Sequence, residues 1–179
     1  MNIPESIITD RSRENVLKIA AFACSSPARF QQLVNCVTGR EKRLSELASW
    51  CLGWAARKKP AMMVPHLDAV TGLLEDTRLS NTVRRNILRI FEDLPVPEEL
   101  HGRIMNICFG FVENPATEIA IRAFSLTTLF RLSSHYPEIR PELKLIIETL
   151  LPDASPAIRS RGRKILQSLA SSGKENTAG

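Results

Sequence analysis

Apolar residues recur every three or four positions along most of this chain, which is the spacing of one helix face. Three long stripes have this spacing: Leu44, Leu47, Ala48, Cys51, Leu52 and Ala55; Val83, Ile87, Ile90, Phe91 and Leu94; and Ile121, Leu126, Leu129 and Leu132. No segment alternates apolar and polar residues over the length of a strand. The pattern predicts an all-α fold of about nine helices and no β-sheet.

Prolines mark where these helices should begin, because proline is tolerated in the first turn of a helix and resisted in its interior. Three prolines follow a residue that caps helices well, in Ser26-Pro27, Asn114-Pro115 and Ser155-Pro156. Thr38 and Glu41 have the spacing of a capping box, with Thr38 as the cap. We expect a helix to start at each of these four places.

The helices also repeat. The pairs Val83-Arg84, Ile121-Arg122 and Ile158-Arg159 lie 38 residues (83 to 121) and 37 residues (121 to 158) apart. When they are aligned, Ile87, Ser125 and Gly162 fall in register, and Leu44 precedes Val83 by 39 residues. A period near 40 residues with two helices per unit is typical of an α-solenoid.

These boundaries define an expected organisation. We predict one domain over residues 11–171, with repeats at about 11–38, 41–76, 79–113 and 116–152 and a closing helix at 155–171. Residues 1–10 are expected to be a flexible lead-in, and residues 172–179 a disordered tail.

The segment from Asp153 to Leu169 resembles the first helix of a HEAT repeat. It has a polar turn, Pro156, the pair Ile158-Arg159, and then Gly162 and Leu166 at the small and large apolar positions. Over residues 11–171 the chain resembles HEAT-repeat (armadillo-type) proteins. This resemblance implies a right-handed α-α superhelix whose second helices line a concave surface.

The chain as a whole is also similar to a group of short bacterial HEAT-like proteins, some of which carry the name adenylosuccinate lyase. We do not transfer that activity. The signature loop of the lyase family, Gly-Ser-Ser-x-Met-Pro-x-Lys-x-Asn, has no counterpart here. Lyase activity is therefore the least favoured of the functions considered.

Charge is unevenly spread along the chain, whose net charge is +5. Lys and Arg exceed Asp and Glu by 14 to 8 in residues 1–90, whereas acids exceed bases by 10 to 5 in residues 91–153. Such segregation can steer an anionic partner. An overall excess of this size is also common in proteins that bind no nucleic acid, so it does not decide the partner class.

The four cysteines, Cys24, Cys36, Cys51 and Cys108, lie in apolar helical stretches without a CxxC pair. We therefore expect buried, reduced thiols and a reducing compartment. The first residues have neither a basic segment nor an apolar segment of a secretory signal, and no apolar run is long enough to span a membrane. The expected location is cytoplasmic, with no membrane contact.

Side chains that could carry chemistry are sparse. The histidines His66, His101 and His135 do not share a short segment with cysteines or carboxylates at zinc spacing, and we expect them to be structural and solvent-facing. No phosphate loop or nucleophile elbow is present. We therefore expect no catalytic residue, no metal and no cofactor.

The first functional hypothesis is a non-enzymatic scaffold that binds a protein or peptide on its concave surface. The polar faces of the second helices supply the candidate contacts, which mix both charges: Gln32, Asn35, Glu99, Arg103, Asn106, Lys144 and Glu148. A groove that follows phosphates would carry Lys or Arg at most of these positions. The aligned arginines Arg84, Arg122 and Arg159 are expected to tie each repeat to the next.

The alternative hypothesis is nucleic-acid binding, possible but not favoured, with the architecture of HEAT-like DNA glycosylases. Trp50 and Trp54 share one helix face and could stack an unpaired base, although packing between repeats is the commoner fate of tryptophan. Those glycosylases pair aromatics with a carboxylate, and Asp68 is the candidate here. The sequence leaves the partner and the exposure of both tryptophans open.

Overall fold

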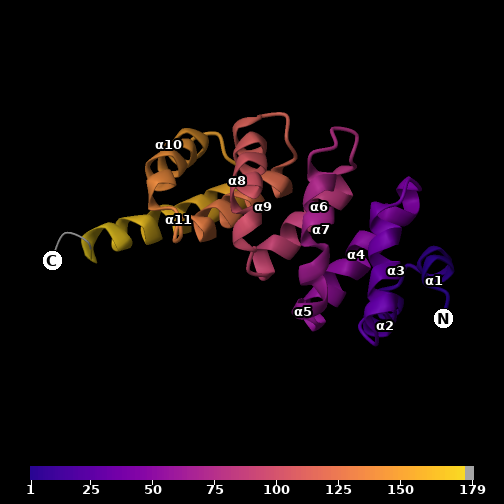
Figure 1. Ribbon diagram of the computed structural model, residues 1–179. Coiled ribbons are helices and arrows are strands. Elements are labelled where there is room, and N and C mark those ends of the chain that lie inside the picture. The colour runs from indigo at the N-terminus through magenta and orange to yellow at the C-terminus, as the bar shows by residue number, and fades with distance from the viewer. Residues whose placement is uncertain (176–179) are drawn as a thin grey trace. The chain divides into compact units, whose positions relative to one another are not determined.

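The structure is a computed structural model that describes residues 1–175, with side chains up to residue 171. The described residues form helices and contain no β-strand (Figure 1). The all-α prediction is confirmed. The α-helices are α1 (Ile3–Thr9), α2 (Arg13–Ala23), α3 (Pro27–Thr38), α4 (Lys42–Lys58), α5 (Pro60–Met63), α6 (Leu67–Leu74), α7 (Asn81–Asp93), α8 (Glu98–Glu113), α9 (Ile119–Leu132), α10 (Arg140–Leu150) and α11 (Pro156–Glu175). Single 3-10 turns, η1 (Val64–His66) and η2 (Pro137–Ile139), precede α6 and α10.

The described residues fall into two compact units, with the division between Leu100 and His101. The division falls inside α8. In the first unit, α2 and α3 occupy the first predicted repeat, and α4 to α6 occupy the second. In the second unit, α9 and α10 occupy the fourth predicted repeat, and α11 follows them.

Both ends of the predicted domain differ from expectation. Residues 1–10 were expected to be flexible, but they contain α1, which packs against α2 and α4 and buries Ile3 and Ile7. Asn15 joins α2 to this segment by donating hydrogen bonds to the carbonyls of Ser6 and Asp10. At the other end, α11 continues through residues 172–175 of the predicted tail, and residues 176–179 lie outside the described residues.

Two of the four predicted helix starts are confirmed. Ser26 caps α3 by accepting a hydrogen bond from the Arg29 amide, and the Ser155 hydroxyl accepts one from the Ile158 amide in α11. The other two are wrong. The cap of α4 is Glu41 itself, whose carboxylate accepts from the amides of Arg43 and Leu44. Asn114 folds a turn instead, accepting from the Ala116 amide, and α9 begins only at Ile119.

The apolar stripes form the core of each unit. The largest fully buried side chains of the first unit come from every helix from α1 to α7 and include Phe30, Leu33, Leu52, Ile87, Leu88 and Phe91. In the second unit, Ile121, Leu126 and Leu129 of α9 are buried together with Leu143 and Ile147 of α10. Each stripe lies on the side of its helix that faces the neighbouring helices, as amphipathic helices require.

Each of the aligned arginines binds a backbone carbonyl a few residues before its own helix. Arg84 donates from Nη2 to the carbonyls of Asp76 and Thr77, at 2.8 and 3.0 Å. Arg122 donates to the Val112 carbonyl at the end of α8, and Arg159 to the Ala154 carbonyl. The Val112 carbonyl lies in the last turn of α8, where carbonyl groups lack a partner within the helix. The prediction that these arginines bind helix-end carbonyls is confirmed for Arg122, whereas Arg84 and Arg159 bind carbonyls of the turns before α7 and α11.

Ser45 stands at the aligned position in the repeat that lacks this arginine. Its hydroxyl donates to the Val37 carbonyl at 2.6 Å, in the last turn of α3. The shorter side chain thus makes the same kind of bond because α3 and α4 are joined by a tighter turn, over Gly39 and Glu41.

Replacing Gly162 by alanine should destabilise the protein, whereas the same substitution at another helical glycine should stabilise it. A Cβ added at Gly162 of α11 would lie 2.9 Å from Cγ2 of Ile147, which is buried. Overpacking costs about 1–3 kcal/mol, more than the roughly 1 kcal/mol that alanine gains over glycine in a helix. We expect Gly162→Ala to lower the free energy of unfolding by about 1 kcal/mol.

The matched control is Gly110→Ala in α8, where an added Cβ faces open space. That substitution should raise the free energy of unfolding by about 0.5–1 kcal/mol. Urea denaturation of both variants measures the two effects. Equal shifts of the same sign would contradict the close approach of α10 and α11 at Gly162.

Candidate interaction surfaces

A hollow of about 630 Å³ lies beside α3, the second helix of the first predicted repeat. Gln32 and Asn35, both predicted contacts, line it together with residues 1–4, Cys36 and Leu44. Gln32 and Asn35 are exposed, and Asn35 accepts a hydrogen bond from the Gln31 amide side chain. The structure therefore brings these two residues together in one hollow whose walls are both polar and apolar. The contribution of residues 1–4 depends on α1, a helix that the sequence pattern did not predict.

The other predicted contacts lie on α8 and α10. On α8, Glu99 and Asn106 are exposed and Arg103 is half-buried. On α10, Lys144 and Glu148 are exposed and form an ion pair one helical turn apart, at 3.8 Å. An exposed pair of this kind contributes little to stability, so both side chains can exchange this contact for one with a partner.

The two tryptophans of α4 have different surroundings. Trp54 is half-buried, and the guanidinium groups of Arg13 and Arg57 lie over its ring at 5.6 and 5.4 Å from the centroid. Trp50 exposes 36% of its surface. The sequence pattern suggested that both tryptophans could stack on a base. In the structure, Arg13 and Arg57 already cover the Trp54 ring.

Trp50 lines a hollow of about 350 Å³ between α4 and α7, which we call the Trp50 hollow. Its walls include Glu46 and Leu47 from α4, and Arg85, Asn86 and Arg89 from α7. Asp68, the carboxylate proposed to act with the tryptophans, is exposed on α6 and is not among the residues that line it. The structure therefore does not place Asp68 in the hollow beside Trp50, which a glycosylase-like pairing would require.

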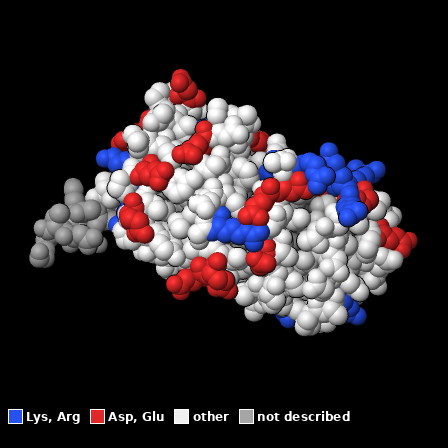
Figure 2. Space-filling view, turned by 45° about the horizontal axis from the view of Figure 1, so that its top comes forward, with Lys and Arg blue, Asp and Glu red and all other residues white. Residues whose placement is uncertain are grey.

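A third hollow, of about 670 Å³, lies where the α3–α4 turn meets the α6–α7 turn. Arg40, Lys42 and Arg78 line it, and Figure 2 shows Lys and Arg side chains gathered over this part of the first unit. The sequence pattern did not predict this site, although Arg40 and Arg78 are one repeat apart. Matching charges in the turns of successive repeats are the signal that could have found it.

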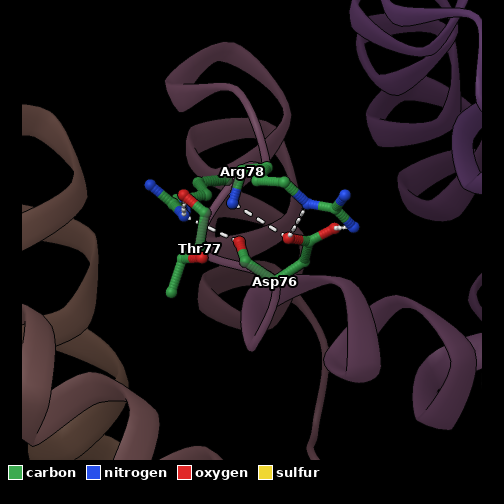
Figure 3. A network of polar contacts seen from close by, with 4 residues as sticks. Asp76, Thr77 and Arg78 are labelled. Atoms are coloured by element: carbon green, nitrogen blue, oxygen red, sulfur yellow. Dashed lines mark hydrogen bonds and ion pairs between the residues drawn. The ribbon is translucent and has the colours of Figure 1, made fainter.

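Asp76 organises one wall of that third hollow (Figure 3). Its carboxylate accepts hydrogen bonds from the Arg78 amide at 2.9 Å and from Arg78 Nε at 3.2 Å. The backbone hydrogen bond from Arg78 is the main cause that lowers the pKa of Asp76, and the Arg78 side chain adds to it. Asp76 thus neutralises part of the positive charge around this hollow.

The histidines are more enclosed than the sequence predicted. His101 is 5% exposed, and its Nδ1 lies 3.1 Å from the Tyr136 hydroxyl. His66 is half-buried and stacks on Phe30 with 5.5 Å between ring centroids, and burial lowers its pKa. Only His135 is solvent-facing, as predicted for all three.

The four cysteines are buried, and none of them forms a disulfide within the described part of the chain. Burial raises the pKa of all four thiols, to about 12 for Cys51 and Cys108. No group of three or more His, Cys, Asp or Glu residues in the described part of the chain is placed to hold a metal ion. None of the described helices combines the length and the apolar character that crossing a membrane requires.

Comparison with models of protein families gives a match over most of the chain. A family model described as a HEAT repeat domain matches residues 4–169. No curated protein and no solved structure matches the chain. The match begins at residue 4 and so includes α1, which agrees with the packing of this helix onto α2 and α4.

Proposed function

Because the chain belongs to the HEAT repeat family, we propose that it is a non-enzymatic repeat scaffold that binds a protein or peptide partner on the exposed side of its second helices. HEAT-type repeats stack to present extended surfaces, which suits the capture of a chain-like partner. The proposed contacts are Gln32 and Asn35 on α3, Glu99, Arg103 and Asn106 on α8, and Lys144 and Glu148 on α10.

The observation that carries this proposal is the hollow beside α3. It is large enough to take several side chains of a peptide, and Gln32 and Asn35 offer it donors and acceptors next to the apolar Ile3 and Leu44. Binding sites are typically preformed hollows whose walls are mostly apolar and carry a small number of polar groups.

The surroundings of the histidines support a role without catalysis. His66 packs on Phe30, and His101 contacts Tyr136 and His135. Neither ring lines one of the three hollows described above. The buried thiols suit a reducing compartment, and we place the protein in the cytoplasm on that ground.

The double variant Gln32→Ala/Asn35→Ala tests the proposal. We expect it to reduce the amount of partner captured from a lysate by about tenfold, since a few residues carry most of the binding energy of an interface. Its melting temperature should stay within about 2 °C of wild type, because exposed substitutions change stability by about 0.5 kcal/mol or less. Quantitative mass spectrometry of the captured proteins is the readout.

Gln167→Ala, an exposed residue of α11, is the control and should capture the partner as wild type does. Undiminished capture by the α3 double variant would remove α3 from the interface. A drop in its melting temperature would show that the two side chains support the fold and not a surface.

A further inference from the structure

The Trp50 hollow lies between α4 and α7, which are the first helices of two successive repeats. The hollow beside α3, in contrast, lies against a second helix. Along α4, Glu46, Trp50, Trp54 and Arg57 follow one another at intervals of four, four and three residues and so share one face. The neighbouring helix α7 packs along α4 and contributes Arg85 and Arg89. One exposed indole and two arginines therefore surround the same hollow.

Polar contacts hold the two walls of the Trp50 hollow together. Asn86 of α7 donates from Nδ2 to the Ser49 hydroxyl of α4 at 2.8 Å, and Ser49 donates in turn to the Glu46 carbonyl at 2.7 Å. Further along the same two helices, Arg57 is paired with Asp93. Because α4 and α7 are fixed to each other, a ligand loses little free energy in organising the site.

The side chains that line the hollow favour a ligand that is both apolar and acidic. The Trp50 ring and Leu47 offer an apolar surface for one anchoring side chain. Arg85 and Arg89 offer guanidinium groups, which bind carboxylates in a bidentate manner. Tryptophan and arginine are also the residue types most enriched among the side chains that dominate protein interfaces.

The same hollow is less suited to nucleic acid. The cations that line it, Arg85 and Arg89, both lie on α7, four residues apart. A site that follows a phosphate backbone needs a continuous run of cations with aromatic platforms. Trp54, which would be the second platform, is covered by Arg13 and Arg57.

We propose that the Trp50 hollow binds an acidic peptide segment of a partner protein, with an apolar anchor against Trp50 and flanking Asp or Glu side chains on Arg85 and Arg89. This surface is separate from the hollow beside α3 and does not depend on the function proposed for the second helices. A partner can therefore bind here whether or not α3 contributes contacts.

Selection from a phage-displayed library of random dodecapeptides on the full chain tests this proposal. We expect the enriched peptides to place Asp or Glu next to one aromatic or aliphatic residue. Fluorescence anisotropy of a labelled enriched peptide should then show at least a tenfold loss of affinity for Trp50→Ala, and a similar loss for Arg89→Glu. Arg163→Glu makes the same charge change on the exposed face of α11 and should leave the affinity unchanged.

Several outcomes would overturn the proposal. They are a library without enrichment, enriched peptides that lack acidic residues, and peptides that bind Trp50→Ala and Arg89→Glu as tightly as wild type. Because Arg89 is exposed, Arg89→Glu stays informative even if Trp50→Ala unfolds. Tighter binding of single-stranded oligothymidylate, lost in both variants, would assign the hollow to nucleic acid instead. The variants of Gln32 and Asn35 should bind the peptide normally, which separates this test from that of the proposed function.

Discussion

Phe30→Ala is expected to lower the free energy of unfolding by about 3–5 kcal/mol, the range found when a fully buried phenylalanine is truncated. Phe30 of α3 has no exposed surface. Its ring stacks on His66, which precedes α6, with an angle of 14° between the planes. The substitution thus removes the packing of Phe30 on His66 and leaves a cavity between the first repeat and the second. Whole domains are stable by only about 5–15 kcal/mol, so the effect is a large share of the total.

Phe22→Ala is the matched control for that prediction. Phe22 is half-buried in α2 and is covered by the Arg29 guanidinium at 4.2 Å from the ring centroid. Its loss should cost about 1 kcal/mol, since little cavity is created at a partly exposed site. Urea denaturation followed by far-UV circular dichroism compares the two variants. Equal costs would mean that α3 does not carry the core contact assigned to it.

The helical core could be predicted from the sequence because its signal is periodic. Val83 and Phe91 recur one repeat later as Ile121 and Leu129. The arginine that follows Val83 and the one that follows Ile121 each bind a backbone carbonyl just before their own helix. When a pattern recurs at a fixed interval, each repeat gives independent support for the same pair of helices. Errors at one repeat are then corrected by the others.

Features without a repeated signal were missed. The helix α1 has only two buried positions, Ile3 and Ile7, so its periodicity is too short to stand out. Asn114-Pro115 is a good helix start in isolation, but the Asn114 side chain binds the Ala116 amide and delays α9 until Ile119. Local caps and turns compete for the same residues, and only the packing of the helix decides between them.

The candidate surfaces depended on neighbours from other helices. Trp50 and Trp54 have the same residue type and lie on one helix face, yet Arg13 of α2 reaches Trp54, and α7 leaves Trp50 in a hollow. Spacing within α4 could place both rings on one face. It could not tell which of them the adjacent helices cover.

The buried thiols give the second large effect, a loss of stability in alkaline solution. The ordinary pKa of a cysteine is 9.0, and burial raises the pKa of Cys51 in the first unit and Cys108 in the second to about 12. Between these values the unfolded chain releases protons that the folded chain keeps, so the free energy of unfolding falls as pH rises. At a pH about 1.5 units above the ordinary value, the loss is about 2 kcal/mol for each thiol.

Cys51→Ala and Cys108→Ala should each flatten this alkaline decline, even if each costs about 1 kcal/mol at neutral pH by leaving a small cavity. The slope of the free energy of unfolding against pH, from urea denaturation at a series of pH values, is therefore the quantity to compare. Cys24→Ala is the control, because Lys58 and Lys59 lower the pKa of Cys24 and so offset part of the rise that burial causes. It should change the slope less than the other two variants. Slopes that match wild type in all three variants would mean that other groups, such as the lysines, control unfolding at high pH.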